Sequence, residues 1–312
     1  MNNIKLDTQR EEASKRILSL PLEDSGLILN CADFYYRKSD FDTALKYFLK
    51  YLTFDENNPE AYYKIAKCYI SKEHFNDGIL YLEKAVWLDG SNVQYRRELS
   101  KIYYKKQDME KARNSIEHLL RIFPDDFWAY SILGNIYLYN YEDAQRACEC
   151  YEKSLEINPD YEWGLYNLAN IKMLLKDYSD AIKLYSKACD ISPENSLFNF
   201  ALAQAYYKVG KTDDAIEILT KVVQIDANNF ETLMLAGKIY LSEKKDIVLA
   251  RKFFEKAKKI SPNNSEVYYY LAKVSFFDFD KKNAMINIDC ALSLYEDDLY
   301  KALKLQIREM EE

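Results

Sequence analysis

Residues 163–195 decide the fold of this chain, and they read WGLYNLANIKMLLKDYSDAIKLYSKACDISPEN. Two segments, 165–169 and 181–188, carry apolar and small residues at three- and four-residue spacing, which is typical of amphipathic helices. Between them, residues 176–180 read KDYSD and supply a turn and an N-cap. Pro193 closes the second segment. The stretch therefore predicts two helices joined by a short turn.

The same pattern recurs along the chain with a period of 34 or 35 residues. A column of small residues marks the second helix of every unit: Ala44, Gly78, Ala112, Ala147, Ala181, Ala215, Ala250 and Ala284. A second small column marks the first helix: Ala32, Ala66, Ser100, Gly134, Ala169, Ala203, Gly237 and Ala272. The units that begin near Phe127 and Phe230 are one residue longer, and we place the extra residue in the turn between the helices. Such a period predicts stacked hairpins that bury their apolar faces against their neighbours.

These columns resemble the tetratricopeptide repeat family in eight repeats, over roughly residues 25–296. Departures are modest, since Lys172 and Ser275 stand where the family usually has Tyr. The resemblance implies an all-α fold, a right-handed superhelical solenoid of helical hairpins whose first helices line the concave side. We expect residues 1–24 to form an N-terminal cap segment and residues 297–312 a C-terminal capping helix, because solenoids need polar ends for solubility.

The composition narrows the function classes. Apolar residues make up 48% and charged residues 30%, which favours an ordered chain with a packed core. The net charge of -7 argues against a general affinity for nucleic acid, because phosphate binding needs a basic face. We find neither the apolar segment of a secretory signal nor the roughly 18 apolar residues of a membrane span. These features predict a cytoplasmic protein.

Residues that carry chemistry are few and scattered. His74 and His118 have no Cys or His near them at the spacing of metal ligands. The six Cys follow no disulfide framework, and Cys148 and Cys150, two apart on a helix, point in different directions. There is no glycine-rich phosphate loop, and no pair of carboxylates stands out as acid and base. The sequence therefore predicts no catalytic residue, no metal site and no cofactor.

The informative surface is the inner face of the first helices. In the related family the second, fifth, sixth, ninth, twelfth and thirteenth positions of a unit tend to face the groove. Here the ninth position is an amide in the central units and lysine on both sides. A row of amides can pair with the backbone of an extended peptide, and neighbouring aromatic residues can anchor its side chains. We predict a peptide-binding groove formed by Lys101, Trp128, Asn135, Tyr139, Trp163, Tyr166, Asn167, Asn170, Phe200, Gln204, Tyr207 and Lys238.

Two other interpretations compete for these residues. Tyrosine-rich helix faces in this fold also serve packing between repeats, and Trp128 and Trp163 are candidates for that role. Co-chaperones of the family hold acidic C-termini with a clamp of lysines, asparagines and an arginine. The nearest register here offers Ser131, Asn135, Asn167, Leu197 and Ala201. Because every cation is missing, we expect no co-chaperone function of that kind.

The sequence thus predicts a non-enzymatic adaptor or scaffold. Its partners would be one or more proteins or extended peptides, with acidic flanks favoured by the lysines. We expect no nucleic acid among them. The alternative is a structural subunit that self-assembles, or joins a larger complex, through its terminal faces.

Overall fold

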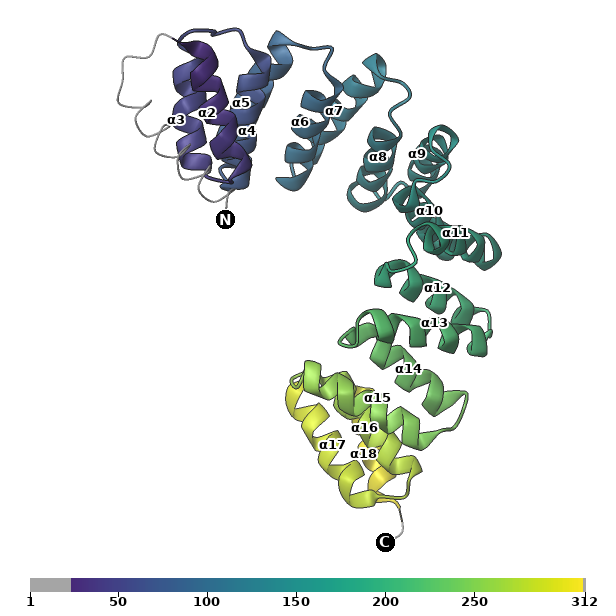
Figure 1. Cartoon of the computed structure of the whole chain (residues 1–312). Coiled ribbons are helices and arrows are strands. Elements are labelled where there is room, and N and C mark those ends of the chain that lie inside the picture. The colour runs from purple at the N-terminus through teal and green to yellow at the C-terminus, as the bar shows by residue number, and fades with distance from the viewer. Residues whose placement is uncertain (1–23, 311–312) are drawn as a thin grey trace, which may run out of the picture. The chain divides into compact units, whose positions relative to one another are not determined.

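The computed structural model describes residues 24–310, and all regular secondary structure in this range is helical. The expected cap segment, residues 1–24, lies outside the described residues except for Asp24, whose carboxylate caps α2. The described helices, labelled as in Figure 1, are α2 (Ser25–Arg37), α3 (Phe41–Tyr51), α4 (Pro59–Ser71), α5 (Phe75–Leu88), α6 (Val93–Lys105), α7 (Met109–Ile122), α8 (Phe127–Asn140), α9 (Ala144–Ile157), α10 (Glu162–Leu174), α11 (Tyr178–Ile191), α12 (Ser196–Lys208), α13 (Thr212–Ile225), α14 (Phe230–Ser242), α15 (Ile247–Ile260), α16 (Ser265–Phe277), α17 (Lys281–Leu294) and α18 (Asp298–Arg308). The all-α prediction is confirmed.

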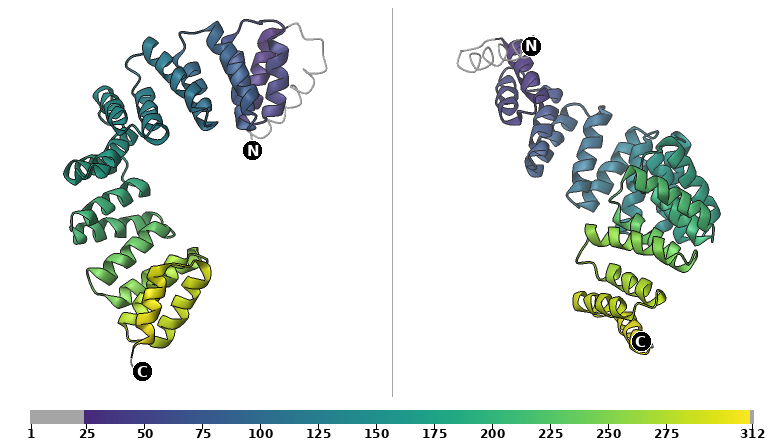
Figure 2. Two further views of the ribbon diagram at one scale, coloured as in Figure 1. Left: turned by 180° about the vertical axis from the view of Figure 1, so that it is seen from behind. Right: turned by 60° about the horizontal axis from the view of Figure 1, so that its bottom comes forward.

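The helices pair in chain order, so that each repeat is one hairpin from α2–α3 to α16–α17. Two compact units divide the chain after Asn158. The first unit contains α2 to α9, and the second contains α10 to α18. Within each unit, consecutive hairpins lie side by side in both views of Figure 2. This stacking of neighbours is what the period of the sequence predicts.

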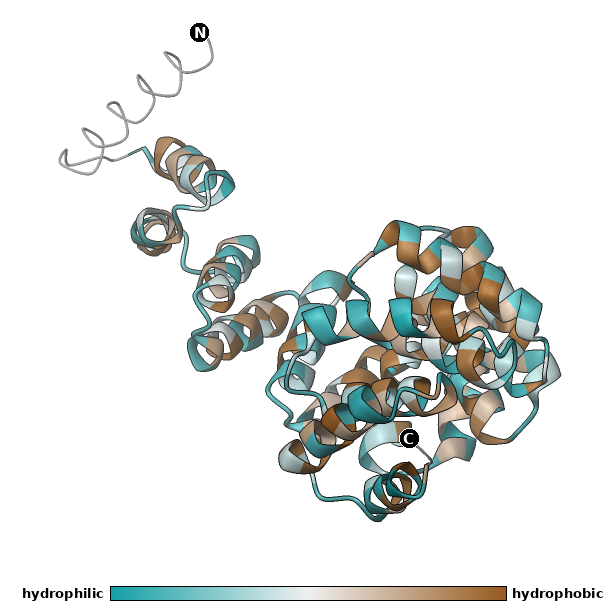
Figure 3. Cartoon of the chain, turned by 90° about the horizontal axis from the view of Figure 1, so that it is seen from below, coloured by the Kyte–Doolittle hydropathy of each residue, from teal (hydrophilic) through white to brown (hydrophobic). Residues whose placement is uncertain are grey.

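Short polar side chains begin most of the helices. In the second helices of six hairpins an Asp carboxylate accepts the backbone N–H three residues later, as Asp177 does from Asp180 and Asp246 from Leu249. First helices more often use Asn, as at Asn195, which accepts from Leu197 and Phe198. These caps satisfy N–H groups that the first helical turn leaves unpaired. In Figure 3 the turns are hydrophilic, whereas the helices that they join carry both apolar and polar residues.

The backbone hydrogen bond that closes the turn of each hairpin differs at two places. In six hairpins a backbone N–H bonds the carbonyl five residues earlier, as from Asp177 to Lys172 at 2.8 Å. In the fourth and seventh repeats the matching bond reaches six residues back, from Asp143 to Tyr137 and from Asp246 to Tyr240, each 2.9 Å. In the seventh repeat the extra residue lies between the helices, where four residues join Ser242 to Ile247, as predicted. In the fourth repeat the link keeps three residues and the extra residue lengthens the end of α8, so the prediction is wrong there.

Small residues hold the two helices of a hairpin close together. Every alanine of the two columns is fully buried. The two glycines of the first-helix column show how close the helices lie: a Cβ atom on Gly134 would lie 2.7 Å from the ring of Tyr151, and one on Gly237 would lie 2.6 Å from the ring of Phe254. Both rings are themselves fully buried. In the second repeat a Cβ atom on Gly78 would likewise lie 2.7 Å from the side chain of Ile70, so the helices approach closely at the small residues of both columns.

Helix α18 packs on the last hairpin through one apolar face. Tyr300, Leu303 and Ile307 are buried against α17, and the ring of Tyr300 stacks on that of Tyr269 at 4.8 Å between centroids. A capping helix needs such contacts with the last hairpin. We propose that residues 297–312 have this capping role. Each of the described helices is too short or too polar to cross a membrane.

Candidate functional site

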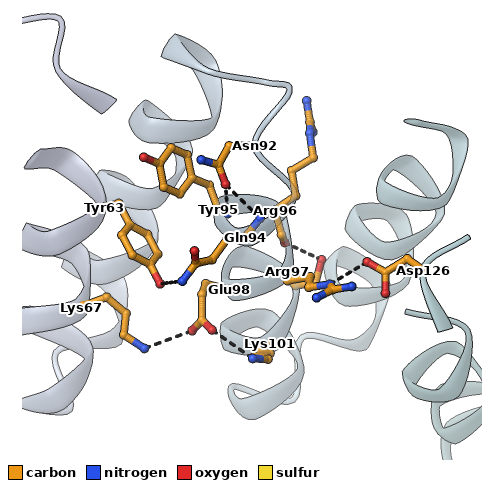
Figure 4. Close-up of polar contacts among 11 residues, drawn as sticks. Tyr63, Lys67, Asn92, Gln94, Tyr95, Arg96, Arg97, Glu98, Lys101 and Asp126 are labelled. Carbon is orange, nitrogen blue, oxygen red and sulfur yellow. Dashed lines mark hydrogen bonds and ion pairs between the residues drawn. The ribbon is translucent and has the colours of Figure 1, made fainter. Parts of the chain in front are cut away.

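Polar side chains join the first helices of neighbouring hairpins in the first unit. The Nζ of Lys64 on α4 lies 2.7 Å from the carboxylate of Asp33 on α2. Glu98 on α6 takes two cations, Lys67 at 3.4 Å and Lys101 at 3.0 Å (Figure 4). All three lysines of this face therefore have a carboxylate partner within the protein.

A second group of contacts continues this network towards α8. The guanidinium Nε of Arg97 lies 2.7 Å from the carboxylate of Asp126, which also caps α8 by accepting from Ala129 (Figure 4). Asp126 is buried, so losing its cation would leave a buried carboxylate without its counter-charge. The amide of Gln94 donates to the hydroxyl of Tyr63 at 2.9 Å. This surface connects repeats to one another, and its charges are already compensated.

The predicted groove residues of α8 divide between packing and exposure. Trp128 is half-buried against the core of the first unit, and the ammonium of Lys101 lies 5.2 Å from the centre of its ring. The Oδ1 of Asn135 accepts a hydrogen bond from the hydroxyl of Tyr151 on α9, at 2.6 Å. Tyr139 is 63% exposed. Trp128 therefore packs within the first unit, in line with the alternative interpretation that this residue serves packing between repeats.

The predicted groove residues of α10 show the same division. The Oδ1 of Asn170 accepts from the hydroxyl of Tyr185 on α11, at 2.5 Å. Asn167 is buried, with 8% exposure, so little of its amide is accessible to a ligand. Trp163 and Tyr166 both contact the ring of the buried Phe198, at 5.0 Å and 5.2 Å between centroids. These aromatic side chains bind the fifth repeat to the sixth.

Helix α12 carries three of the predicted groove residues. Phe200, Gln204 and Tyr207 follow one another at four- and three-residue spacing, so they share one face of the helix. Phe200 and Tyr207 are half-buried against the core, whereas Gln204 is exposed and bonds no other described residue. Of the three predicted amides of the ninth position, Gln204 is the one that keeps its side chain available.

This face leads into a cavity of about 630 Å³ formed by α12, α14 and α16. The predicted residues Tyr207 and Lys238 line it. Lys273, one of the lysines of the ninth-position column, lines it too, whereas the sequence analysis did not name Tyr270 and Phe277, which also line it. These two occupy the sixth and thirteenth positions of the eighth repeat, so the family pattern could have found them. It could not have found Lys245, which reaches the cavity from the α14–α15 turn.

The cavity is rich in positive charge. Lys238 lies 2.7 Å from Glu266, and its ammonium is 5.0 Å from the centre of the Tyr270 ring. Lys273 lies 5.8 Å from the same ring centre and forms no ion pair with a described residue. Burial, with help from Glu266, raises the pKa of Tyr270 to about 12. Its hydroxyl therefore remains a neutral hydrogen-bond donor throughout the physiological range.

The described part of the chain shows no cluster of metal-binding or nucleophilic side chains. Residues 24–310 contain no cluster of three or more His, Cys, Asp or Glu arranged to hold a metal ion. The six cysteines, all within the described residues, form no disulfide bond with one another. Burial raises the pKa of the Cys68 thiol to about 12, and that of Cys150 and Cys189 to about 11. Because the thiolate is the nucleophile, these three thiols are chemically inert at neutral pH.

Family models match most of the second half of the chain. Three tetratricopeptide repeat models match residues 172–239, residues 150–183, and residues 129–161 together with 230–264. A model of subunit 3 of the anaphase-promoting complex, or cyclosome, matches residues 37–119. A comparison with curated proteins found no match.

Solved structures of repeat proteins resemble the chain at low sequence identity. PilF of Pseudomonas aeruginosa has a TM-score of 0.61 at 18% identity, over 70% of this chain and 98% of its own. A tetratricopeptide repeat protein from Parabacteroides merdae has a TM-score of 0.58 at 17% identity, over 81% and 98%. The Cut9–Hcn1 hetero-tetramer of the anaphase-promoting complex has a TM-score of 0.59 at 15% identity, and the match covers 96% of this chain and 59% of that one.

At such identities the likeness shows the fold alone. The family matches, the repeat period and the paired helices agree with one another. Tetratricopeptide repeats are protein–protein interaction modules. The chain is a tetratricopeptide repeat protein.

Proposed function

We propose that this chain is a non-enzymatic adaptor that binds a polypeptide segment along the first helices of its second unit. The observation that carries the proposal is the face of α12. There Gln204 keeps an exposed amide beside the aromatic rings of Phe200 and Tyr207, and the face opens into a lysine-rich cavity. An amide that can donate and accept, next to aromatic anchors, suits the backbone and side chains of an extended peptide.

The first unit supports such binding less well. A peptide carboxylate that approached Lys67 or Lys101 would have to compete with Glu98, which already pairs with both. It would also have to displace that carboxylate from a partly buried position, at a cost in desolvation. In the second unit Lys245 and Lys273 form no ion pair with a described residue, so we place the ligand there.

The test uses peptides selected from a phage-displayed library of random linear peptides against the immobilised full chain. Their affinity is then measured with Gln204→Ala combined with Tyr207→Phe, which removes polar groups but keeps the packing. Each lost hydrogen bond costs about 0.5–1.5 kcal/mol, so the dissociation constant should rise about tenfold. The matched control is Gln224→Ala, an exposed amide on the second helix of the same hairpin. Equal binding by all three proteins would reject this surface.

A second candidate function is that of a subunit in a larger assembly. On α5, Leu80 and Trp87 are 63% and 72% exposed, and they lie seven residues apart on one face. The ammonium of Lys84 lies 4.1 Å from the centre of the Trp87 ring. This apolar stripe lies within the segment that matches the anaphase-promoting complex subunit. Light scattering of the wild type and of Trp87→Ala would reveal self-association through this stripe as a loss of oligomer in the variant.

We further propose a reducing compartment such as the cytoplasm. The lack of a disulfide bond among the six described cysteines supports it, since extracellular proteins tend to pair their cysteines.

A further inference from the structure

The cavity of the second unit has the dimensions of a binding site. Its volume of about 630 Å³ falls within the roughly 300–1,000 Å³ of most ligand pockets. Side chains reach it from three first helices: Tyr207 from α12, Lys238 and Leu241 from α14, and Tyr270 and Lys273 from α16. Three consecutive repeats therefore build it together.

Its charge is unusual for this protein. Among the residues that line the cavity are three lysines and no carboxylate. One of them, Lys238, has Glu266 as its partner, while Lys245 and Lys273 form no ion pair with a described residue. The chain as a whole has a net charge of -7, so this is a local excess of positive charge on an acidic protein. The excess favours an anion.

The lysines have an aromatic support that holds them in place. The ammonium groups of Lys238 and Lys273 lie 5.0 Å and 5.8 Å from the centre of the Tyr270 ring, and that of Lys273 also lies 5.6 Å from the centre of the Tyr269 ring. The Tyr270 ring is stacked on the fully buried Phe254, with 5.1 Å between centroids and 13° between planes. A supported ring of this kind gives the ammonium groups a preferred position before any ligand arrives.

One side of the cavity is apolar. Leu241, Ile247 and Phe277 line it, and Phe277 is 47% exposed. A small inorganic anion would use the lysines and leave these side chains in water. A ligand that places an apolar side chain beside a carboxylate uses both parts, because burying apolar surface adds to the ionic attraction.

We infer that this cavity binds an acidic–aromatic segment of a partner polypeptide. Lys245 and Lys273 receive its carboxylates, and Leu241, Ile247 and Phe277 receive the adjoining aromatic side chain. The exposed amide of Gln204 lies along the way to the cavity on α12, where the peptide backbone would continue. This inference rests on the proposed function and adds the chemistry of the partner to it.

The experiment measures the fluorescence anisotropy of three labelled peptides with the full chain. The probe contains Asp-Phe-Glu between glycine and serine spacers. One companion replaces the acids by their amides, as Asn-Phe-Gln, and the other replaces the ring, as Asp-Ala-Glu. We expect the probe to bind about tenfold more tightly than either companion, and its affinity to fall as salt is raised.

The variants separate the cavity from the general charge of the protein. Lys245→Gln with Lys273→Gln should weaken the probe about tenfold while leaving the amide companion unchanged. The matched control is Lys256→Gln with Lys259→Gln, which removes two exposed lysines from α15, the second helix of the seventh repeat. The control should bind the probe as the wild type does. Melting curves should show all proteins folded.

The possible failures are distinct. If the library-selected peptides bind through Gln204 but are neutral, and the cavity variants do not affect them, the acidic–aromatic preference is wrong and the adaptor function stands. If inorganic phosphate displaces the probe at concentrations near the dissociation constant of the probe, and the Asp-Ala-Glu peptide binds as tightly as the probe, the cavity is a simple anion site and the inference is overturned. If no peptide of either kind binds, the proposed function itself fails.

Discussion

Gly237→Ala would test why two repeats carry glycine where the others carry alanine or serine. The added Cβ would lie 2.6, 2.7 and 2.9 Å from three atoms of the Phe254 ring. Carbon atoms in good contact are about 3.5–4.0 Å apart, so the ring would have to move by about 1 Å. It has little freedom to do so, because it is fully buried and stacked on Tyr270 of the next repeat.

Two opposing effects set the magnitude. Overpacking a buried site costs about 1–3 kcal/mol. Replacing glycine by alanine inside a helix returns about 0.5–1 kcal/mol of propensity. The clash dominates because the atoms in the way belong to a fixed ring and not to the end of a flexible side chain. We therefore expect a net loss of about 0.5–2 kcal/mol in the free energy of unfolding.

Urea denaturation followed by circular dichroism would measure the loss as a lower midpoint. Phe254→Leu provides the matched second site, since Ala with Leu is the pairing of the second and sixth repeats, Ala66 with Leu82 and Ala203 with Leu219. Phe254→Leu alone should destabilise by removing buried volume. Combined with Gly237→Ala it should cost less than the sum of the two. A single Gly237→Ala variant as stable as the wild type would refute the fixed-ring argument.

Three further predictions follow from the contacts described above. Removing residues 297–312 would uncover the buried Ile288 and Ala291, so the truncated chain should melt earlier or aggregate in light scattering; equal stability would reject the capping role. Burial raises the pKa of Tyr63 and of Tyr270 to about 12, so the folded state holds these two protons more tightly than the unfolded state. The free energy of unfolding should therefore be constant up to about pH 9. Above pH 10 it should fall by up to about 1.4 kcal/mol per pH unit for each of these tyrosines. Denaturation curves across that range would reveal a flat profile if the shifts are absent. Asn170→Ala should lower the melting temperature, because it removes the hydrogen-bond acceptor of Tyr185 and with it about 0.5–1.5 kcal/mol of the free energy of unfolding. Gln204→Ala should leave the melting temperature unchanged. Melting curves of the two variants therefore distinguish a structural amide from one that is available to a ligand.

The sequence by itself determined the repeat architecture. The two small columns, the caps and the period all act within a few residues or within one hairpin, and such local rules are legible in a single chain. The spacing alone also showed that the fourth and seventh repeats carry an extra residue, although it did not show that this residue lengthens α8 in one and the turn in the other. The sequence also shows that the two repeats with the extra residue are those that carry Gly134 and Gly237, but it does not show why.

Only the tertiary structure decided which inner-face residues remain available to a partner. Asn135 and Asn170 share a column with Gln204, yet tyrosines of the second helices take their oxygens and leave Gln204 exposed. Lys67 shares a column with Lys273, yet Glu98 of the next repeat pairs with the former, while the latter reaches a cavity without a carboxylate. Helical spacing places a side chain on a face, but its availability depends on partners that lie fifteen or more residues away and are brought close by packing alone.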